Sequence, residues 1–203
     1  MNIAILGATG TFGSALANNL LQQTEHHLIL ISRRAQNIYQ NDERITAINI
    51  DATNDEELEE ALQGANIVYC AISGRQLPLV AKNLVHIMPK LHISRLLFMG
   101  AIGIYNEIPV DMDGDDNLDN EPEQIPNRQA VDIIEASSLN YTILRPGYLR
   151  DGSMDDYVLT GKGEQAKGYI STIPSVIAFA TKLINDETLY SRQSIGITKN
   201  MTK

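Results

Sequence analysis

A second cysteine is missing from this sequence of 203 residues, so the chain cannot close an internal disulfide. The single cysteine, Cys70, lies inside an apolar run, which favours a buried side chain over a reactive thiol and fits a reducing compartment. The chain also has no apolar stretch as long as a membrane span, and no basic leader with a cleavage site at its N-terminus. These absences predict a cytoplasmic protein without a membrane partner.

Positive charge is scarce: 16 Lys and Arg residues stand against 25 Asp and Glu, which gives a formal net charge of −9. Nucleic acids and anionic membranes repel such a surface, so neither is expected as a partner. Metal-ligand spacing is missing as well, because the four histidines lack nearby cysteine or carboxylate partners. The run Asp111-Met112-Asp113-Gly114-Asp115 resembles a calcium loop but lacks the glycine that such a loop needs at its sixth position. No metal site is predicted.

Short apolar runs recur along the chain, and segments with helical spacing lie between them. Most of the runs are continuous rather than alternating, as in parallel strands that are covered on both faces. The expected strands are Ile3–Leu6, Leu28–Ile31, Ile45–Ile50, Ile67–Ile72, Leu96–Met99, Tyr141–Leu144 and Ile195–Ile197. This alternation predicts an α/β fold: a Rossmann-like, doubly wound parallel sheet with helices on both faces, forming a single domain over residues 1–203.

Two helix starts carry capping signals. Thr53-Asn54-Asp55-Glu56 predicts a capping box. Thr172, followed by Pro174, predicts the start of a helix near the C-terminus.

Residues 106–127 interrupt the alternation of strands and helices. This segment has eight acidic residues, no basic residue and three prolines. Such a composition favours a long, solvated loop after the fifth strand, and a loop at this position could line a substrate pocket. The chain after Gly147 is short and is expected to form a small elaboration on the substrate side.

The N-terminal strand runs directly into Gly7-Ala8-Thr9-Gly10-Thr11-Phe12-Gly13, and a helical pattern follows. Gly7 permits a tight turn, Gly10 lets the backbone approach a pyrophosphate, and Gly13 lets the helix pack close to the sheet. The N–H groups and the dipole of that helix favour a phosphate. The motif predicts dinucleotide binding; the alternative is a plain strand-to-helix turn.

The expected second strand ends in Ser32-Arg33-Arg34. NAD-selective proteins usually place an acidic residue here to hold the ribose 2′-hydroxyl, whereas arginine accommodates the 2′-phosphate of NADP. Two guanidinium groups suit a phosphate, so NADP(H) is predicted over NAD(H), with solvent-facing arginines as the alternative. Asp51, followed by Ala52, closes the third strand where a carboxylate can reach the adenine amino group. The alternative is that Asp51 only begins the next turn.

The ends of the later strands define the edge where a substrate is expected. Ala71-Ile72-Ser73 stand at the end of the fourth strand and border the crevice at the switch point of a doubly wound sheet. Tyr105 follows the fifth strand, and Tyr148 and Arg150 follow the sixth. A tyrosine here could stack on an acceptor or donate a proton, and an arginine could steady a developing anion, so these three are the candidate catalytic residues. For the tyrosines the alternative is packing at the base of the loops.

Three motifs together resemble the atypical short-chain dehydrogenases/reductases, and among them the NmrA-like, biliverdin reductase B-like NAD(P)-binding proteins. The motifs are Gly7–Gly13, Asp51, and Tyr141-Thr142-Ile143-Leu144-Arg145-Pro146-Gly147 preceded by Ser137-Ser138-Leu139. The resemblance covers nearly the whole chain. It implies that the glycine motif holds the pyrophosphate, that the aspartate reaches adenine and that the Pro-Gly pair borders the nicotinamide. The residues to which it gives a cofactor role are Gly7, Thr9, Gly10, Thr11, Phe12, Gly13, Asp51, Pro146 and Gly147.

The sequence departs from that family in its proton-donating residues. Typical members carry a Tyr-x-x-x-Lys pair, in which the lysine lowers the tyrosine pKa, but those places fall on Glu123 and Asn127. The serine that commonly follows the fifth strand falls on Gly100-Ala101. A carbonyl reductase of the standard kind and a sugar-nucleotide epimerase are therefore not expected.

Hydride transfer to a flavin or quinone needs fewer catalytic side chains than carbonyl reduction, because the nicotinamide carries the chemistry and the protein supplies orientation. The sequence thus predicts an NADP(H)-binding oxidoreductase that passes hydride to a small flavin-like or quinone-like acceptor. The alternative is a non-catalytic redox sensor that binds NADP(H) and acts through a protein partner.

Overall fold

The computed structural model describes residues 1–39, 43–112, 114–154 and 157–200. Its strands are β1 Asn2–Leu6, β2 His27–Ser32, β3 Ile45–Asn49, β4 Ile67–Cys70, β5 Arg95–Met99, β6 Tyr141–Pro146, β7 Tyr148–Arg150, β8 Val158–Thr160, β9 Ile170–Thr172 and β10 Gln193–Thr198. Within these ranges eight strands form one sheet in the order β3-β2-β1-β4-β5-β6-β10-β8, and β7 pairs with β9. Neighbours in the large sheet are parallel except β10 and β8. The order reverses between β1 and β4, which places a switch point at their carboxyl ends.

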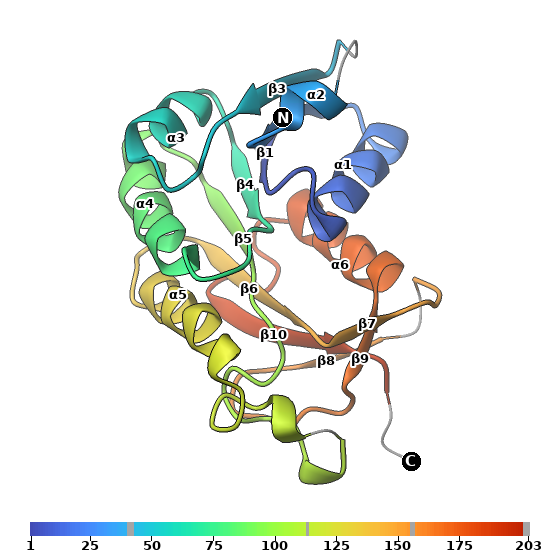
Figure 1. Cartoon of the computed structure of the whole chain (residues 1–203). Coiled ribbons are helices and arrows are strands. Elements are labelled where there is room, and N and C mark those ends of the chain that lie inside the picture. Colours follow the sequence, from blue (N-terminus) through green and yellow to red (C-terminus); the bar gives the residue numbers. More distant parts are fainter. Residues whose placement is uncertain (40–42, 113, 155–156, 201–203) are drawn as a thin grey trace.

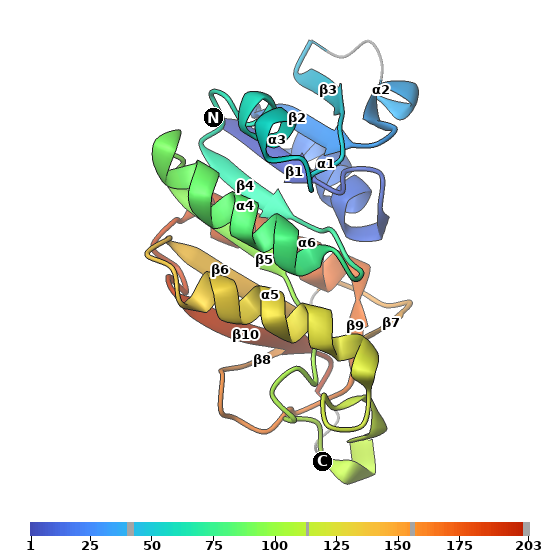
Figure 2. The ribbon, with the colours of Figure 1, turned by 60° about the vertical axis from the view of Figure 1, so that its left-hand side comes forward.

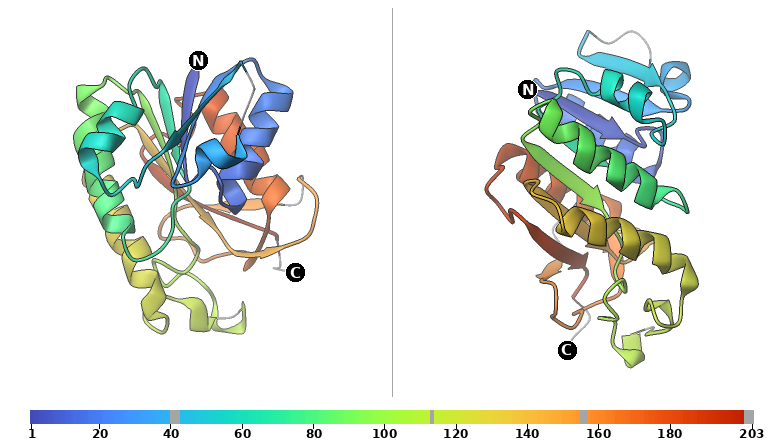
Figure 3. Two further views of the ribbon diagram at one scale, coloured as in Figure 1. Left: turned by 45° about the horizontal axis from the view of Figure 1, so that its top comes forward. Right: turned by 90° about the vertical axis from the view of Figure 1, so that its left-hand side faces the viewer.

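Helices cover both faces of this sheet (Figures 1 and 3). They are α1 Thr11–Gln23, α2 Ala35–Ile38, α3 Asp55–Ala61, α4 Leu77–Lys90, α5 Ile125–Glu135 and α6 Ile173–Asn185. Helices α1 and α6 lie on one face, and α3, α4 and α5 lie on the other. Successive side chains of β1 follow this division: Ile3 and Ile5 pack with α1 and α6, whereas Ala4 and Leu6 pack into the opposite core. Over the part of the chain that is described, no helix is long and apolar enough to cross a membrane.

The seven expected strands are all present, as β1 to β6 and β10, and the doubly wound α/β fold is confirmed. Both faces of the sheet are apolar, which explains why the runs in the sequence are continuous rather than alternating. Two strands are shorter than predicted: β3 ends at Asn49 rather than Ile50, and β4 ends at Cys70, so that Ile72 belongs to the following turn. The strands β7, β8 and β9 were not predicted, since three residues are too few to show a periodic pattern.

Of the two predicted helix caps, one is confirmed and one is displaced. The Thr172 hydroxyl accepts a hydrogen bond from the N–H of Ser175 at the start of α6. The predicted capping box at Thr53 is wrong by one residue: the Asn54 side chain caps α3 by accepting from Glu57 N–H. Thr53 does not cap because its hydroxyl donates to Asp51.

The acidic segment after β5 is more ordered than the predicted solvated loop (Figure 2, the yellow-green segment at the bottom). It contains three 3-10 helices, Val110–Met112, Gly114–Asp116 and Pro122–Gln124, before α5 begins. The buried Asn117 side chain makes hydrogen bonds to both the N–H and the carbonyl of Ile108. The carboxylate of Asp116 accepts a hydrogen bond from the Tyr169 hydroxyl, which fastens the segment to the residue before β9. The sequence did not predict these hydrogen bonds, because the many carboxylates that face water indicated a solvated loop.

Candidate functional site

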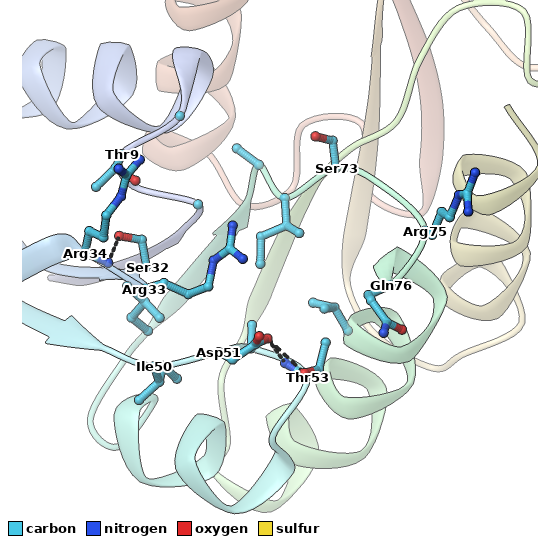
Figure 4. A pocket seen from close by; sticks show the side chains of 17 residues that line it. Thr9, Ser32, Arg33, Arg34, Ile50, Asp51, Thr53, Ser73, Arg75 and Gln76 are labelled. Carbon is cyan, nitrogen blue, oxygen red and sulfur yellow. Dashed lines mark hydrogen bonds between the residues drawn. The ribbon is translucent and has the colours of Figure 1, made fainter. Parts of the chain in front are cut away.

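A cavity of about 400 Å³ opens at the carboxyl ends of β1, β2, β3 and β4 (Figure 4). This position is the switch point of the sheet, where doubly wound α/β proteins bind their ligands. The cavity is lined by Gly7, Thr9, Gly10, Ile31, Ser32, Arg33, Arg34, Ile50, Asp51, Ala52, Thr53, Ala71, Ile72, Ser73, Arg75, Gln76 and Val80. Residues from four separate predicted motifs therefore meet in one place.

The glycines of the N-terminal turn have distinct structural roles. Gly7 has φ +76°, and a Cβ there would lie 2.8 Å from the Ala71 carbonyl oxygen, so no other residue fits this position well. A Cβ at Gly13 would lie 2.2 Å from the Gly7 carbonyl oxygen, because α1 packs tightly on the turn. Gly10 is different: its Cβ would meet only the Gly7 oxygen, at 3.3 Å, and the residue lines the cavity. Gly7 and Gly13 serve packing, and Gly10 leaves the cavity floor open.

Helix α1 begins at this turn with no side-chain cap. The Gly10 N–H donates to Gly7 and the Ser14 N–H donates to Gly10. Within the described ranges, the intervening N–H groups of Thr11, Phe12 and Gly13 have no protein acceptor. Free N–H groups at a helix N-terminus, with the positive end of the helix dipole, are a good match for a phosphate group. The residues at the turn therefore fit the pyrophosphate of a dinucleotide.

Positive charge gathers in the cavity although the chain as a whole is acidic. Its described lining holds three arginines, Arg33, Arg34 and Arg75, and a single carboxylate, that of Asp51. Arg33 points into the middle of the cavity, and Arg34 lies beside Thr9 of the glycine-rich turn (Figure 4). None of the three arginines makes an ion pair with another residue in the part of the chain that the structure describes. Guanidinium groups that form no salt bridge within the protein are available to an anionic ligand such as a phosphate.

Asp51 lies across the cavity from the glycine-rich turn, directly after β3. One carboxylate oxygen accepts hydrogen bonds from Thr53 N–H at 3.0 Å and from the Thr53 hydroxyl at 2.8 Å. These bonds, together with the positive charge of Arg33, lower the pKa of Asp51, so the carboxylate stays ionised. The buried Asn83 of α4 donates to the carbonyls of Ala52 and Thr53, each at 3.2 Å, and fixes this turn against α4.

Part of the predicted set lies outside the cavity. Thr11, Phe12, Gly13, Pro146 and Gly147 do not line it, because the cavity follows β1 to β4 and stops short of β6. Their roles toward a cofactor stay predictions. The lining residues that the sequence did not single out are Ile31, Ile50, Thr53, Arg75, Gln76 and Val80. Arg75 and Gln76 could have been found, since they directly follow the turn after β4, at the same edge as Arg33.

The prediction that Tyr105 faces an acceptor is not supported by its position. Its hydroxyl donates to Glu135 at 2.8 Å and accepts from the Ser194 hydroxyl at 3.0 Å, against α5 and β10. Burial raises the pKa of Tyr105 far above its ordinary value. The ring is also contacted by the cations of Arg128 at 4.7 Å and Lys162 at 4.8 Å. The alternative, packing at the base of the loop, describes this tyrosine.

Tyr148 and Arg150 lie where the sequence predicted them, on β7 directly after the end of β6. The Tyr148 side chain is 51% exposed. The Arg150 guanidinium lies 4.6 Å from the centre of the Tyr148 ring, and Tyr169 stacks on that ring at 6.1 Å. This exposed aromatic and cationic pair remains available to an acceptor.

The arginine of the Tyr141–Gly147 motif has a structural role. Arg145 is fully buried and forms an ion pair with the buried Glu107. It also donates to the Ser194 hydroxyl at 3.1 Å and to the Gly161 carbonyl at 3.2 Å. These contacts join β6, β10, the turn after β8 and the acidic segment, so the side chain is not available to a ligand.

The structure also bears on the residues without a predicted role. Burial raises the pKa of the Cys70 thiol to about 12, which leaves it protonated and inert. Among the described residues, no group of three or more His, Cys, Asp or Glu side chains is placed to hold a metal ion. Asp113 of the calcium-like run lies outside the described residues.

The proton-donating set expected of the family has no counterpart in the sequence. No tyrosine of the chain is followed by a lysine four residues later. Asn127, at one of the expected places, donates instead to the Gln124 side chain at 3.0 Å. A Cβ at Gly100 would lie 3.2 Å from the Ile143 side chain, so a serine there would be crowded.

A cavity at the switch point of a doubly wound sheet, with a glycine-rich turn, an uncapped helix and free arginines, defines a dinucleotide-binding domain of the Rossmann type. The comparison with protein families agrees: residues 7–187 match the family described as NAD(P)H-binding. The chain belongs to the NAD(P)H-binding family, and the resemblance to short-chain dehydrogenases/reductases is confirmed.

Solved structures with similar folds support this assignment. A Rossmann-fold NAD(P)-binding family protein from Shigella flexneri is 32% identical, with a TM-score of 0.84 over 100% of this chain and 95% of that one. A short-chain dehydrogenase/reductase from Veillonella parvula DSM 2008, solved in complex with NADP, is 29% identical, with a TM-score of 0.88 over 99% and 95%. An anaerobilin reductase from Escherichia coli O157:H7 shares the fold at 18% identity and a TM-score of 0.83, over 100% and 99%.

Among curated proteins, a glycerol-3-phosphate dehydrogenase [NAD(P)+] from Limosilactobacillus reuteri is 32% identical over 149 residues. The match covers 67% of this chain but only 41% of that relative. It therefore supports the nucleotide-binding assignment rather than the activity of the longer protein.

Proposed function

We propose that the protein is an NADP(H)-dependent reductase that passes hydride to a flavin-like or quinone-like small molecule. The observation that carries this proposal is an NAD(P)H-binding chain with free arginines in its cavity and no Tyr-x-x-x-Lys pair in its sequence. The cytoplasm, which supplies such cofactors, remains the proposed compartment.

The cavity residues would bind and orient the cofactor, which supplies the hydride when it is bound. Arg33 and Arg34 would hold the 2′-phosphate, as their free guanidinium groups and their place after β2 suggest. The free N–H groups of Thr11 and Phe12 would hold the pyrophosphate at the start of α1. The ionised Asp51 would accept a hydrogen bond from the adenine amino group.

The class of acceptor follows from what the site lacks. Reduction of a ketone or aldehyde creates a localised alkoxide, which has to be protonated or stabilised as it forms. A flavin or quinone spreads the incoming charge over a conjugated system, so no proton from the enzyme is required at the transition state. With its hydroxyl bound to Glu135 and Ser194, Tyr105 is not available to protonate a localised alkoxide.

Steady-state oxidation of NADPH against FMN, riboflavin, a quinone and several aldehydes tests the proposal. General acid catalysis contributes about 10²- to 10⁴-fold to a rate, so kcat/KM for the aldehydes is expected to lie at least about 100-fold below that for the flavins. Fast aldehyde reduction would overturn the mechanism. NADPH binding without turnover of any acceptor would favour the alternative, a redox sensor that acts through a protein partner.

The exposed ring of Tyr148 gives a second prediction. Tyr148→Ala is expected to raise the KM for the acceptor about 2- to 10-fold with little change in kcat, because an aromatic contact contributes about 0.5–1.5 kcal/mol. Tyr148→Phe keeps the ring and should behave like the parent protein. Michaelis–Menten curves for all three proteins with FMN decide the point. A fall in kcat for Tyr148→Phe would instead identify the hydroxyl as a proton donor.

A further inference from the structure

Tyr39 connects two parts of the dinucleotide cavity that are far apart in the sequence. It follows α2, directly after the segment that carries Arg33 and Arg34. Its hydroxyl donates a hydrogen bond of 2.6 Å to the carbonyl of Ala8, inside the glycine-rich turn. The ring packs against the core beneath α1 and α6, and burial raises the pKa of the hydroxyl. The hydroxyl therefore stays protonated and remains a donor.

Together with a backbone hydrogen bond to β2, the Tyr39 bond holds both the N–H and the carbonyl of Ala8. The Ala8 N–H donates to the Ile31 carbonyl at 3.2 Å, and the Ala8 carbonyl accepts from Tyr39. Because a trans peptide unit is planar, its C=O and the following N–H point in opposite directions. Holding the Ala8 carbonyl toward Tyr39 therefore turns the Thr9 N–H away from Tyr39. Thr9 itself lines the cavity.

We propose that Tyr39 is a positioning residue for the cofactor: its hydroxyl holds the Ala8–Thr9 peptide in the orientation that presents an N–H group to the pyrophosphate. It also links the turn to the arginines proposed to bind the 2′-phosphate, so that the two phosphate sites keep a fixed separation. This inference rests on the proposed binding of NADP(H). Without the hydroxyl, the Ala8 carbonyl loses its partner and the peptide can rotate, which would turn a carbonyl oxygen toward the phosphates.

The variant Tyr39→Phe removes only the hydroxyl and keeps the packing of the ring. It is expected to weaken NADPH binding about 10-fold, as loss of one hydrogen bond to a charged group does. Binding of adenosine 2′-phosphate, which has the 2′-phosphate but no pyrophosphate, is expected to stay within about 2-fold of the parent. The measurement is a competition titration with both ligands. Because both report on the same folded molecules, the ratio of the two Kd values does not depend on how much of the variant folds.

Tyr157→Phe is the matched control. It also removes one tyrosine hydroxyl, which accepts a hydrogen bond from Lys182 at 2.9 Å, and Tyr157 does not line the cavity. The Kd values of NADPH and of adenosine 2′-phosphate are expected to stay unchanged in this variant. Equal weakening of both ligands by Tyr39→Phe would show a merely structural role and overturn the proposal, and so would an unchanged NADPH affinity. Failure of the parent protein to bind NADPH would instead overturn the proposed function.

Discussion

Replacing Arg33 and Arg34 together by alanine is expected to weaken NADPH binding by about 10- to 1000-fold and to leave NADH binding nearly unchanged. Each charge-assisted hydrogen bond to a phosphate contributes about 1.5–3 kcal/mol, and one or two such bonds give this range. Both arginines line the cavity, and neither forms a salt bridge among the described residues, so their removal breaks no ion pair of the fold. Titration of parent and variant with both cofactors measures the effect.

The control for this experiment makes the same change in net charge elsewhere. Lys82 and Lys90 are exposed on α4 and do not line the cavity. The double variant Lys82→Ala, Lys90→Ala should bind NADPH like the parent. This result would show that the arginine variant loses affinity through local contacts and not through the change in the protein's overall electrostatic field. Equal affinities of the parent for NADPH and NADH would contradict the predicted preference.

Gly10→Val is expected to abolish cofactor binding while the ligand-free protein keeps most of its stability. The new side chain would meet only the Gly7 oxygen within the protein, but it would fill the cavity floor where the pyrophosphate is proposed to lie. A ligand present at 100 times its Kd stabilises a protein by about 2.7 kcal/mol, which for a chain of this size raises the Tm by about 5–10 °C. This NADPH-induced rise should be absent in the variant.

Gly13→Ala provides the contrast within the same turn. Its Cβ would lie 2.2 Å from a backbone oxygen, so this smaller substitution should lower the Tm of the ligand-free protein more than Gly10→Val does. Thermal melts of both variants, with and without NADPH, test the two roles together. A Gly10→Val protein that unfolds outright, or that keeps its response to NADPH, would show that the turn serves the fold alone.

The sequence predicts the large sheet well because each strand is an uninterrupted apolar run. Ile3 and Ile5 face one core and Ala4 and Leu6 the other, so a strand buried on both sides produces the continuous apolar pattern. The short pair β7 and β9 depends on contacts that local pattern does not encode. Its residues are fixed by Gly147, whose N–H donates to Ser171 at 2.7 Å.

The cavity was predictable where residues follow strands that the sequence reveals. Arg33, Asp51 and Ala71 follow β2, β3 and β4, whose carboxyl ends lie at one edge of the parallel sheet, so topology alone brings them together. The position of the Tyr105 side chain could not be predicted, for the opposite reason. It lies in an irregular segment that turns back over β10, and only tertiary contacts such as that with Ser194 decide where its hydroxyl goes.

The packing of α6 on α1 has a consequence for the order in which the chain can assemble. Asn19 of α1 donates to Thr181 of α6 at 2.9 Å, across 162 residues of sequence, and Leu16 and Leu20 share a core with Phe179 and Leu183. Until α6 has been synthesised, the apolar face of the helix that follows the glycine-rich turn packs on the sheet but lacks its cover from α6. Contacts of such long sequence separation form slowly, because the loop between them has to close first. The residues that line the cavity all lie in the first 80 positions, yet a nascent chain should gain affinity for the nucleotide only after Asn185 has left the ribosome.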